Sequence, residues 1–383
     1  MGPIPYAKQY IPQEDKAAIL ETLSDPFLTT GPRLGEFEKA FATYIGAPYA
    51  VAVTNGTAAL HLCAKALDVG PGTKALCPSL TFAASANCIL HEGGEIDFVD
   101  IELETGLIDL GKLKAKLQQA PPNHYQIIIA VDFAGYPLHM DRLRKIADTY
   151  HCKIIEDSCH APGAFYQDEL GKRQQSGNAS YADLSIFSFH PTKHITTGEG
   201  GMVTCSDAKL AARLKRLRNH GITKDPELLQ KEEGGWYYEL QELGLNYRMT
   251  DIQARLGLTQ LAHAEDWLSK RREISRRYRT AFANSPIRCM ADIEGHAYHL
   301  FVIRYGRRKE LYEYLRSQSI YCQVHYVPLH LHPIYQKQGW KRGDLPQTET
   351  YYDSCLSLPM YPSLTEEEQA YVIEKILFFA GKD

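Results

Sequence analysis

The sequence predicts an α/β protein whose mostly parallel sheet carries helices on both faces. Short apolar runs alternate with amphipathic stretches over the first two thirds of the chain, and several runs end in polar residues. Such alternation is typical of parallel strands, because each strand needs a long crossover connection to reach its neighbour. From about Met249 the pattern changes to long helical stretches. We therefore expect a large α/β domain over residues 1–255 and a smaller α+β domain over residues 256–383.

The expected strands of the large domain are short apolar runs, as buried strands usually are. They lie at residues 49–53, 74–77, 95–99, 126–131, 153–156, 184–189 and 202–205. Helical periodicity between them predicts helices at residues 34–44, 57–67, 140–149 and 208–218. In the last third we expect a helical stretch broken near Ala264, helices at residues 265–281, 309–318 and 365–378, and strands at residues 299–304 and 321–327.

Composition excludes several classes of protein. The chain has 383 residues, a formal net charge of −4 and 9 cysteines, none in a CxxC pair. That charge provides no basic footprint for nucleic acid, and the cysteine spacing favours reduced thiols over a disulfide framework. We see no leader pattern and no apolar run long enough to span a bilayer. We expect a cytoplasmic protein with neither a nucleic-acid nor a membrane partner.

Ligands of open α/β sheets bind beyond the carboxyl ends of the strands, so residues that follow the strands are candidate site residues. The first candidate is the turn Thr54-Asn55-Gly56-Thr57, which opens an apolar helix. Backbone N–H groups and the helix dipole at such a turn suit a phosphate. Alternatively, Thr57 is an ordinary helix cap.

Two further candidates follow neighbouring strands. Phe82 follows the run at residues 74–77 and could stack on a flat ring, although it could equally be a core residue. Asp157 ends an apolar strand, and a carboxylate there would favour protonation of a pyridine nitrogen. Its alternative role is a helix cap or a surface charge.

The fourth candidate is the loop after the run at residues 184–189, which delivers Lys193 into a glycine-rich turn. Burial lowers the pKa of a lysine, and a neutral amine can form a Schiff base with an aldehyde. Ser188 is available for phosphate, whereas the alternative for Lys193 is a solvated loop residue. Together the four places predict pyridoxal 5′-phosphate as cofactor. A nicotinamide cofactor is not predicted, because no GxGxxG turn follows a strand.

The chain also resembles the DegT/DnrJ/EryC1/StrS family of sugar aminotransferases over nearly its whole length. The motifs that carry the resemblance are at residues 28–32, 54–57, 156–161, 188–201 and 244–251. It implies the fold type I architecture of aspartate aminotransferase and a cofactor bound to Lys193, with Asp157 at the pyridine nitrogen. The resemblance also implies that the remaining cofactor contacts come from Phe82, His160, Thr57, Ala58 and Ser188. Many relatives have Gln where this chain has His160.

A homodimer with shared active sites follows from the same resemblance, because Asn246 would reach the phosphate of the neighbouring subunit. L-glutamate would be the amino donor, and Lys193 would carry the proton between the two reacting carbons. Arg248 is the candidate for an anion contact with donor or acceptor, with an interface or surface arginine as its alternative. We further expect substrate contacts from Tyr6, Thr30 and His190.

The acceptor is suggested by residues 322–330 and 358–365, which look most like members that aminate UDP-4-keto-6-deoxy-N-acetylhexosamines on the way to pseudaminic acid. In that reading His325 and Tyr326 contact the sugar, although either could be a packed strand residue. Alternatives are other nucleotide keto sugars, of the perosamine, legionaminic acid, bacillosamine or L-Ara4N types. A sugar dehydratase would have His in place of Lys193, and a noncatalytic regulator would have a damaged site. We expect no metal, because Pro191 interrupts the His190 and His194 pair and no carboxylate accompanies it.

Overall fold

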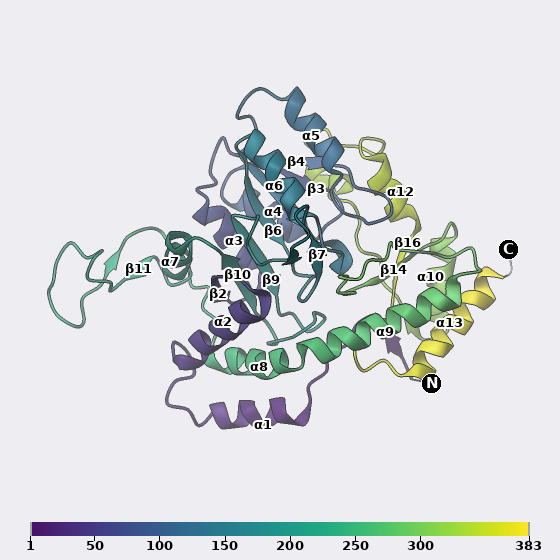
Figure 1. Cartoon of the computed structure of the whole chain (residues 1–383), viewed down its shortest axis with the longest axis horizontal. Coiled ribbons are helices and arrows are strands. Elements are labelled where there is room, and N and C mark those ends of the chain that lie inside the picture. Colours follow the sequence, from purple (N-terminus) through teal and green to yellow (C-terminus); the bar gives the residue numbers. More distant parts are fainter. Residues whose placement is uncertain (1, 382–383) are drawn as a thin grey trace.

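The computed structural model describes residues 2–381 and centres on a seven-stranded sheet (Figure 1). The strand order is β2-β10-β9-β6-β5-β3-β4. The strands are β2 (Tyr49–Val53), β3 (Lys74–Pro78), β4 (Glu95–Val99), β5 (Ile127–Val131), β6 (Lys153–Asp157), β9 (Leu184–Ser188) and β10 (Gly201–Cys205). Each one matches a predicted apolar run to within one residue at either end.

One strand of the sheet runs against the others. β10 is antiparallel to both β9 and β2, whereas the pairs β3–β4, β3–β5, β5–β6 and β6–β9 are parallel. Residues 189–200 join β9 to β10 and contain no helix, so the chain cannot cross over to a parallel position. It turns back instead, and this turn carries Lys193. The prediction of a mostly parallel sheet is confirmed.

Helices cover both faces of the sheet because successive strand residues point to opposite sides. In β3, Ala75 and Cys77 belong to one apolar layer and Leu76 to the other. The first layer includes residues of α3 (Gly56–Ala66), α4 (Ala83–His91) and α7 (Ala208–Leu217). The second includes residues of α5 (Leu110–Gln119) and α6 (Met140–Thr149). The sequence patterns predicted α3, α6 and α7 but missed α4 and α5.

The last third forms a smaller sheet with long helices. Strands β13 (Arg288–Cys289), β14 (Phe301–Arg304) and β16 (Cys355–Leu358) pair in an antiparallel sheet. Around it lie α9 (Ala264–Phe282), α10 (Arg308–Ser317), α12 (Pro346–Ser354) and α13 (Glu366–Ala380). α8 (Asp251–Ala262) precedes α9, and the break between them falls where it was expected. α8 packs on α1 (Gln13–Thr22) and α2 (Pro32–Ile45) below the sheet (Figure 1).

The predicted strand at residues 321–327 is wrong. Only β15 (Ile320–Tyr321) is a strand there, and it pairs with β1 (Ile4–Pro5) of the N-terminal arm. Gln323 makes an isolated bridge to Ser357, and the chain then continues without strand pairing. Instead of pairing as a strand, this segment lines a cavity with His325 and Tyr326.

Short elements complete the fold. They are η1 (Phe133–Gly135), β7 (Phe165–Gln167), β8 (Arg173–Gln175), η2 (Leu329–Leu331), α11 (Pro333–Gln336), β11 (Ile222–Thr223) and β12 (Glu239–Leu240). The segment around β11 and β12 projects away from the body of the molecule (Figure 1). Among residues 2–381, no helix combines the length and the apolar character needed to cross a membrane.

Candidate active site

A cavity of about 490 Å³ opens at the carboxyl ends of the sheet strands. Its size is typical of small-molecule sites. The predicted site residues that line it are Tyr6, Thr57, Phe82, Asp157, His160, Ser188, His190, Lys193, His325 and Tyr326. The sequence patterns therefore identified residues from six separate segments that the fold brings together. We call the residues on β6, β9, α3 and their loops the sheet wall, and His299, His325 and Tyr326 the C-terminal wall.

The N-terminus of α3 forms one corner of the cavity. Asn55, and not Thr57, caps the helix, because its Oδ1 accepts the N–H of Ala58 at 2.8 Å. Thr57 is thereby left exposed toward the cavity, while Ala58 is buried and does not line it. The N–H groups of the first helical turn have no partner within their own helix, so this corner suits a phosphate.

Close packing between Gly56 and Ser188 shapes the same corner. A Cβ atom added to Gly56 would lie 2.9 Å from the Cβ of Ser188 and 3.2 Å from its Oγ. A side chain at position 56 would therefore push Ser188 away. Glycine lets the backbone of α3 and the hydroxyl of Ser188 face the same small volume, as a bound phosphate requires.

Asp157 lies at the end of β6 and is held on both carboxylate oxygens. Ser85 donates its hydroxyl to Oδ2 at 2.8 Å, and the N–H of Cys159 donates to Oδ1 at 3.2 Å. The hydroxyls of Ser85 and Thr81 also bond to each other at 2.9 Å. These contacts fix the carboxylate while it still lines the cavity. A fixed negative charge at this position can hold the proton of a heterocyclic nitrogen.

The loop that carries Lys193 is anchored at both sides. The hydroxyl of Thr196 donates to the carbonyl of Phe189 at 2.9 Å, and the N–H of Thr197 donates to the same carbonyl at 3.0 Å. Gln260 of α8 accepts the N–H of Thr196 at 3.1 Å. The N–H of Lys193 itself closes a turn onto the carbonyl of His190 at 2.8 Å. Lys193 is therefore presented by a braced loop and not by a solvated one.

Burial lowers the pKa of Lys193, while the neighbouring side chains of Cys159 and Asp157 act in the opposite direction. The amine lies in the cavity together with Asp157. A lysine with a lowered pKa supplies more neutral amine, which is the form that attacks an aldehyde. Because Lys193 lies in the cavity, it is not the solvated loop lysine of the alternative interpretation.

His160 is neutral, and its hydrogen bonds fix the tautomer. Its Nδ1 accepts the backbone N–H of Ala134 at 3.2 Å, so the ring proton is on Nε2. Nε2 lies 3.3 Å from the hydroxyl of Tyr326. Burial lowers the pKa of His160 well below its usual range, and nearby Lys193 adds to the effect. His160 therefore acts as a hydrogen-bond donor toward the cavity and not as a cation.

Phe82 lies at the mouth of the cavity with 59% of its surface exposed. Its ring centroid is 6.1 Å from that of Tyr326. An aromatic ring that exposed is poorly explained as a core residue. It is available to stack on a flat ligand instead, which is the role expected from the sequence.

The C-terminal wall consists of neutral polar rings. His325 pairs with the hydroxyl of Ser357 at 2.8 Å, and burial lowers its pKa to about 3. The ring of His299 contacts that of His160 at a tilt of 31° with centroids 4.2 Å apart, and burial likewise lowers the pKa of His299. Burial raises the pKa of Tyr326, so its phenol stays protonated. This wall offers hydrogen bonds and flat surfaces without a net charge.

Two further predicted residues enter from loops. Tyr6 follows β1, and its ring lies 5.3 Å from that of His325. The pairing of β1 with β15 and a bond from the N–H of Met360 to the carbonyl of Tyr6 at 2.9 Å hold it there. His190 is exposed at the rim, with Nδ1 2.9 Å from the hydroxyl of Thr192.

Three predicted site residues lie outside this cavity. Thr30 and Asn246 are exposed, and Arg248 donates Nη1 to the side-chain oxygen of Asn219 at 2.7 Å. Asn246 itself bridges to Asn219, which holds this segment against the end of α7. None of the three contributes to the cavity of its own chain.

The sequence reasoning missed other residues of the cavity, including Asn55, Cys159, Thr192, Glu199 and His299. Asn55 carried a signal, since asparagine is a preferred residue before a helix. His299 carried none, because only the packing of the last third against η1 brings it to His160. Among residues 2–381, no group of three or more potential metal ligands is present.

The residues of the cavity fit pyridoxal phosphate. The corner of α3 and Ser188 would hold the phosphate, Asp157 the pyridine nitrogen, and Lys193 the aldehyde carbon, with Phe82 and His160 beside the ring. The tight approach of Gly56 to Ser188 and the exposed ring of Phe82 are the observations that support this fit. When bound, the cofactor supplies an electron sink for the carbon that gains or loses the proton.

Comparison with known proteins agrees with this chemistry. A sequence profile of the DegT/DnrJ/EryC1/StrS aminotransferase family matches residues 9–377. The spore coat polysaccharide biosynthesis protein SpsC of Bacillus subtilis is 38% identical, over 97% of this chain and 96% of that protein. UDP-4-amino-4,6-dideoxy-N-acetyl-beta-L-altrosamine transaminase of Campylobacter jejuni is 36% identical, over 98% of this chain and 97% of that protein.

Solved structures give the same result. The putative sugar aminotransferase Spr1654 from Streptococcus pneumoniae, in its PMP form, superposes with a TM-score of 0.90 at 31% identity over 99% of each chain. Helicobacter pylori PseC, an aminotransferase involved in the biosynthesis of pseudoaminic acid, gives 0.89 at 28% identity over 100% of each chain. The chain therefore belongs to the DegT/DnrJ/EryC1/StrS aminotransferase family, and is a pyridoxal-phosphate-dependent sugar aminotransferase.

Proposed function

We propose that the protein moves an amino group from L-glutamate to C4 of a UDP-4-keto-6-deoxy-N-acetylhexosamine, in a pathway of the pseudaminic acid type. One observation carries the reaction class: Lys193 and Asp157 share a single cavity with the α3 corner. The acceptor class is supported by the name of the Campylobacter jejuni relative and by the likeness to PseC. The neutral, polar C-terminal wall of the cavity, with His325 and Tyr326, suits a sugar rich in hydroxyl and amide groups.

Each residue has a stated task in this proposal. The amine of Lys193 would hold the cofactor at its aldehyde carbon and, when free, would carry the proton to and from the donor α-carbon. Asp157 holds the proton on the pyridine nitrogen. His160 donates from Nε2 toward the ring. The same residues then work in the reverse direction on the keto sugar.

We also place Asn246 in the active site of a neighbouring subunit. Its exposure and its position outside the cavity of its own chain support a role in trans. Arg248, two residues further on, would supply the anion contact from the same direction. Lys193 is the only lysine or arginine among the cavity residues that the structure describes, so a glutamate carboxylate needs such a contribution.

The substrate is tested by half reactions. Protein loaded with pyridoxal phosphate should lose its visible absorbance on addition of L-glutamate and regain it with UDP-4-keto-6-deoxy-N-acetylhexosamine. A panel of UDP- and dTDP-linked 4-keto and 3-keto sugars, with NMR of the products, identifies the preferred acceptor. A flat response to every UDP sugar would contradict the proposed acceptor, and preference for another keto sugar would replace it.

The shared site has a separate test. Subunits with Lys193→Ala are mixed with subunits with Asn246→Ala, so that a mixed dimer contains one site with both native residues. We expect activity above the mean of the two parents. If activity never exceeds that mean, the proposed role of Asn246 in trans is wrong.

A further inference from the structure

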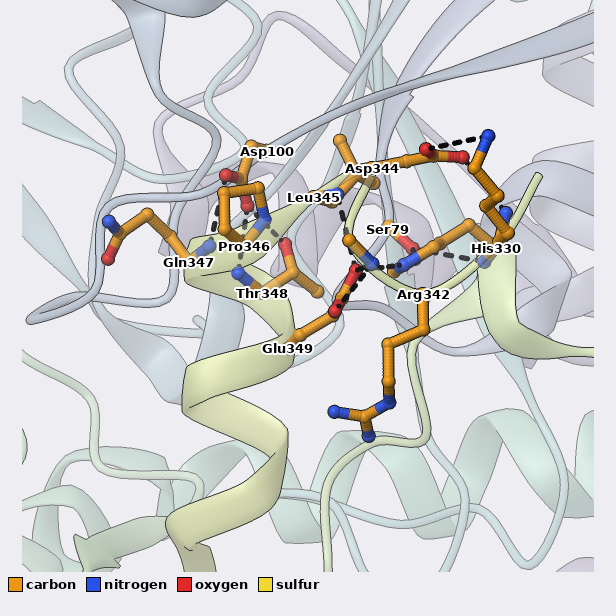
Figure 2. A network of polar contacts seen from close by, with 12 residues as sticks. Ser79, Asp100, His330, Arg342, Asp344, Leu345, Pro346, Gln347, Thr348 and Glu349 are labelled. Carbon is orange, nitrogen blue, oxygen red and sulfur yellow. Dashed lines mark hydrogen bonds and ion pairs between the residues drawn. The ribbon is translucent and has the colours of Figure 1, made fainter.

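A buried polar network joins the β3–α4 loop to the segment that follows Tyr326. Ser79, His330 and Glu349 form its centre (Figure 2). The Nδ1 of His330 lies 2.8 Å from the hydroxyl of Ser79, and its Nε2 lies 3.0 Å from Oε1 of Glu349. Ser79 and His330 are fully buried, and Glu349 is 6% exposed.

The donor and the acceptor of each hydrogen bond in this network can be assigned. The backbone N–H of His330 donates to the hydroxyl oxygen of Ser79 at 3.1 Å, which leaves the hydroxyl proton for Nδ1 of the same histidine. The ring proton is then on Nε2 and is donated to Glu349. Glu349 also accepts the N–H of Gly343 at 2.8 Å and that of Leu345 at 3.3 Å. Every polar atom of the His330 ring is therefore in use.

Neither a hydrolytic triad nor a metal site explains these residues. The hydroxyl of Ser79 is fully buried, and none of Ser79, His330 and Glu349 lines the active-site cavity, so a substrate bound there does not reach this hydroxyl. Both ring nitrogens of His330 are engaged by protein partners. The network is therefore structural in its chemistry, and its position in the fold indicates what it supports.

The two chain segments that it joins each carry an aromatic residue of the cavity, Phe82 and Tyr326. Ser79 lies three residues before Phe82, and His330 lies four residues after Tyr326. Ser79 and His330 are 251 residues apart in sequence. A further bond, from the N–H of Leu329 to the carbonyl of Ser79 at 2.9 Å, ties the same two segments. Phe82 and Tyr326 both line the cavity, and their rings form a tilted aromatic pair with centroids 6.1 Å apart.

A second contact holds the far end of this segment on the edge of the sheet. Asp100, directly after edge strand β4, accepts the N–H groups of Gln347 at 3.1 Å and Thr348 at 2.8 Å (Figure 2). It thus caps the N-terminus of α12, whose own preceding residue Leu345 provides no side-chain cap. Lys112 balances the charge of Asp100 at 2.7 Å. Residues 329–349 are therefore fixed at both ends, and only the Ser79 end adjoins the cavity.

We propose that the Ser79–His330 bond, braced by Glu349, is a positioning device that sets the separation of Phe82 and Tyr326. It thereby fixes how these two rings border the cavity in which the cofactor and the substrates would fit. This inference rests on the proposed function of the cavity. Glu349 contributes by keeping the His330 ring in one tautomer and orientation, as a carboxylate behind a histidine does in other sites.

The test uses full-length protein loaded with pyridoxal phosphate and three variants. Ser79→Ala removes the pin, and His330→Gln removes it while an amide N–H remains for Glu349. Thr204→Val is the matched control, because it deletes another fully buried hydroxyl. Thr204 lies on β10, and its hydroxyl donates to the carbonyl of Gly177 at 2.6 Å. The readouts are cofactor content, visible circular dichroism of the bound cofactor, and KM and kcat for L-glutamate in the half reaction.

We expect Ser79→Ala and His330→Gln to retain cofactor, to lose visible dichroism relative to absorbance, and to raise the KM for L-glutamate about tenfold with a smaller change in kcat. Thr204→Val should lower the melting temperature similarly and leave dichroism and KM unchanged. If all three variants behave alike, the positioning role is wrong while the proposed function stands. If the wild-type protein binds no cofactor, both proposals fail.

Discussion

The two walls of the cavity meet the ligand with different chemistry. The sheet wall carries the amine and the carboxylate of the proposed chemistry, Lys193 and Asp157, held by backbone and hydroxyl contacts. The C-terminal wall presents His299, His325 and Tyr326, which burial keeps uncharged. In the proposed function this difference separates two tasks: proton transfer would depend on the sheet wall, whereas recognition of the substrate by shape and hydrogen bonding would depend on the C-terminal wall.

The largest effect is expected on the sheet wall, from Lys193→Ala. Loss of the proton carrier should lower the rate of the half reaction with L-glutamate by about 10⁴-fold. Protein-bound cofactor should also lose the absorbance band of its linkage to lysine. The measurement is single-turnover absorbance with L-glutamate. Turnover near the wild-type rate would remove Lys193 from the mechanism.

Asp157→Asn should have the next largest effect. The amide cannot hold a positive pyridine nitrogen, so we expect kcat to fall about a hundredfold. The bonds from Ser85 and Cys159 limit disturbance of the fold, since an amide oxygen can still accept one of them. Ser85→Ala is the companion variant and should lose far less activity. A smaller loss for Asp157→Asn than for Ser85→Ala would contradict the role of the carboxylate.

On the C-terminal wall, Tyr326→Phe should act on KM more than on kcat. The variant removes one hydroxyl, 3.3 Å from His160, and keeps the ring. Loss of one hydrogen bond predicts a change of about three- to tenfold in KM for the keto sugar. Steady-state kinetics with saturating L-glutamate gives the two constants separately. A hundredfold fall in kcat with unchanged KM would show that the two walls do not divide the tasks.

The smallest effect concerns acid stability and the neutral histidines. The pKa of His325 is about 3 in the folded protein and about 6.5 when unfolded. Between these pH values the unfolded chain therefore binds more protons at His325 than the folded protein does. The stability that neutral His325 contributes is fully present above about pH 6.5 and is lost as pH falls toward 3. His325 contributes a slope of at most about 1.4 kcal/mol per pH unit.

Denaturant unfolding at several pH values measures this slope. His325→Gln should reduce it, because glutamine does not titrate. His91→Gln, at an exposed histidine, is the control and should leave the slope unchanged. Equal slopes for the wild type and His325→Gln would mean that His325 binds its proton equally well in the folded and unfolded protein.

Much of the sheet wall could be predicted from sequence because its residues directly follow strands. Asp157, Ser188 and Lys193 are placed by β6 and β9, whose apolar runs were evident. The antiparallel course of β10 follows from the short connection at residues 189–200. Such local patterns specify which edge of a sheet a residue occupies. For the sheet wall this information was sufficient to predict which residues share the cavity.

The C-terminal wall was less accessible to the same reasoning. Residues 322–327 are apolar enough to suggest a strand, but beyond the single bridge of Gln323 to Ser357 they pair with no strand, and His325 and Tyr326 line the cavity, so no period-two pattern reports their role. His325 and Tyr326 were identified only through the family resemblance. His299 was missed because its place depends on η1, where Gly135 allows a close approach: a Cβ there would lie 3.0 Å from the N of His299.

The N-terminal arm contributes Tyr6 to the cavity and could be cut from the rest of the chain. Residues 7–10 lie between β1 and α1 without regular structure, and Lys8 is exposed. A single tryptic cut after Lys8 would leave the segment that ends at Lys8 held by noncovalent contacts, which include the β1–β15 pairing, the buried side chain of Ile4 and the Tyr6–Met360 bond. Such a nicked enzyme should keep its sheet and its lysine yet lose Tyr6 on dilution. Synthetic peptide 1–8 should then restore activity, which would make the protein a natural fragment-complementation system.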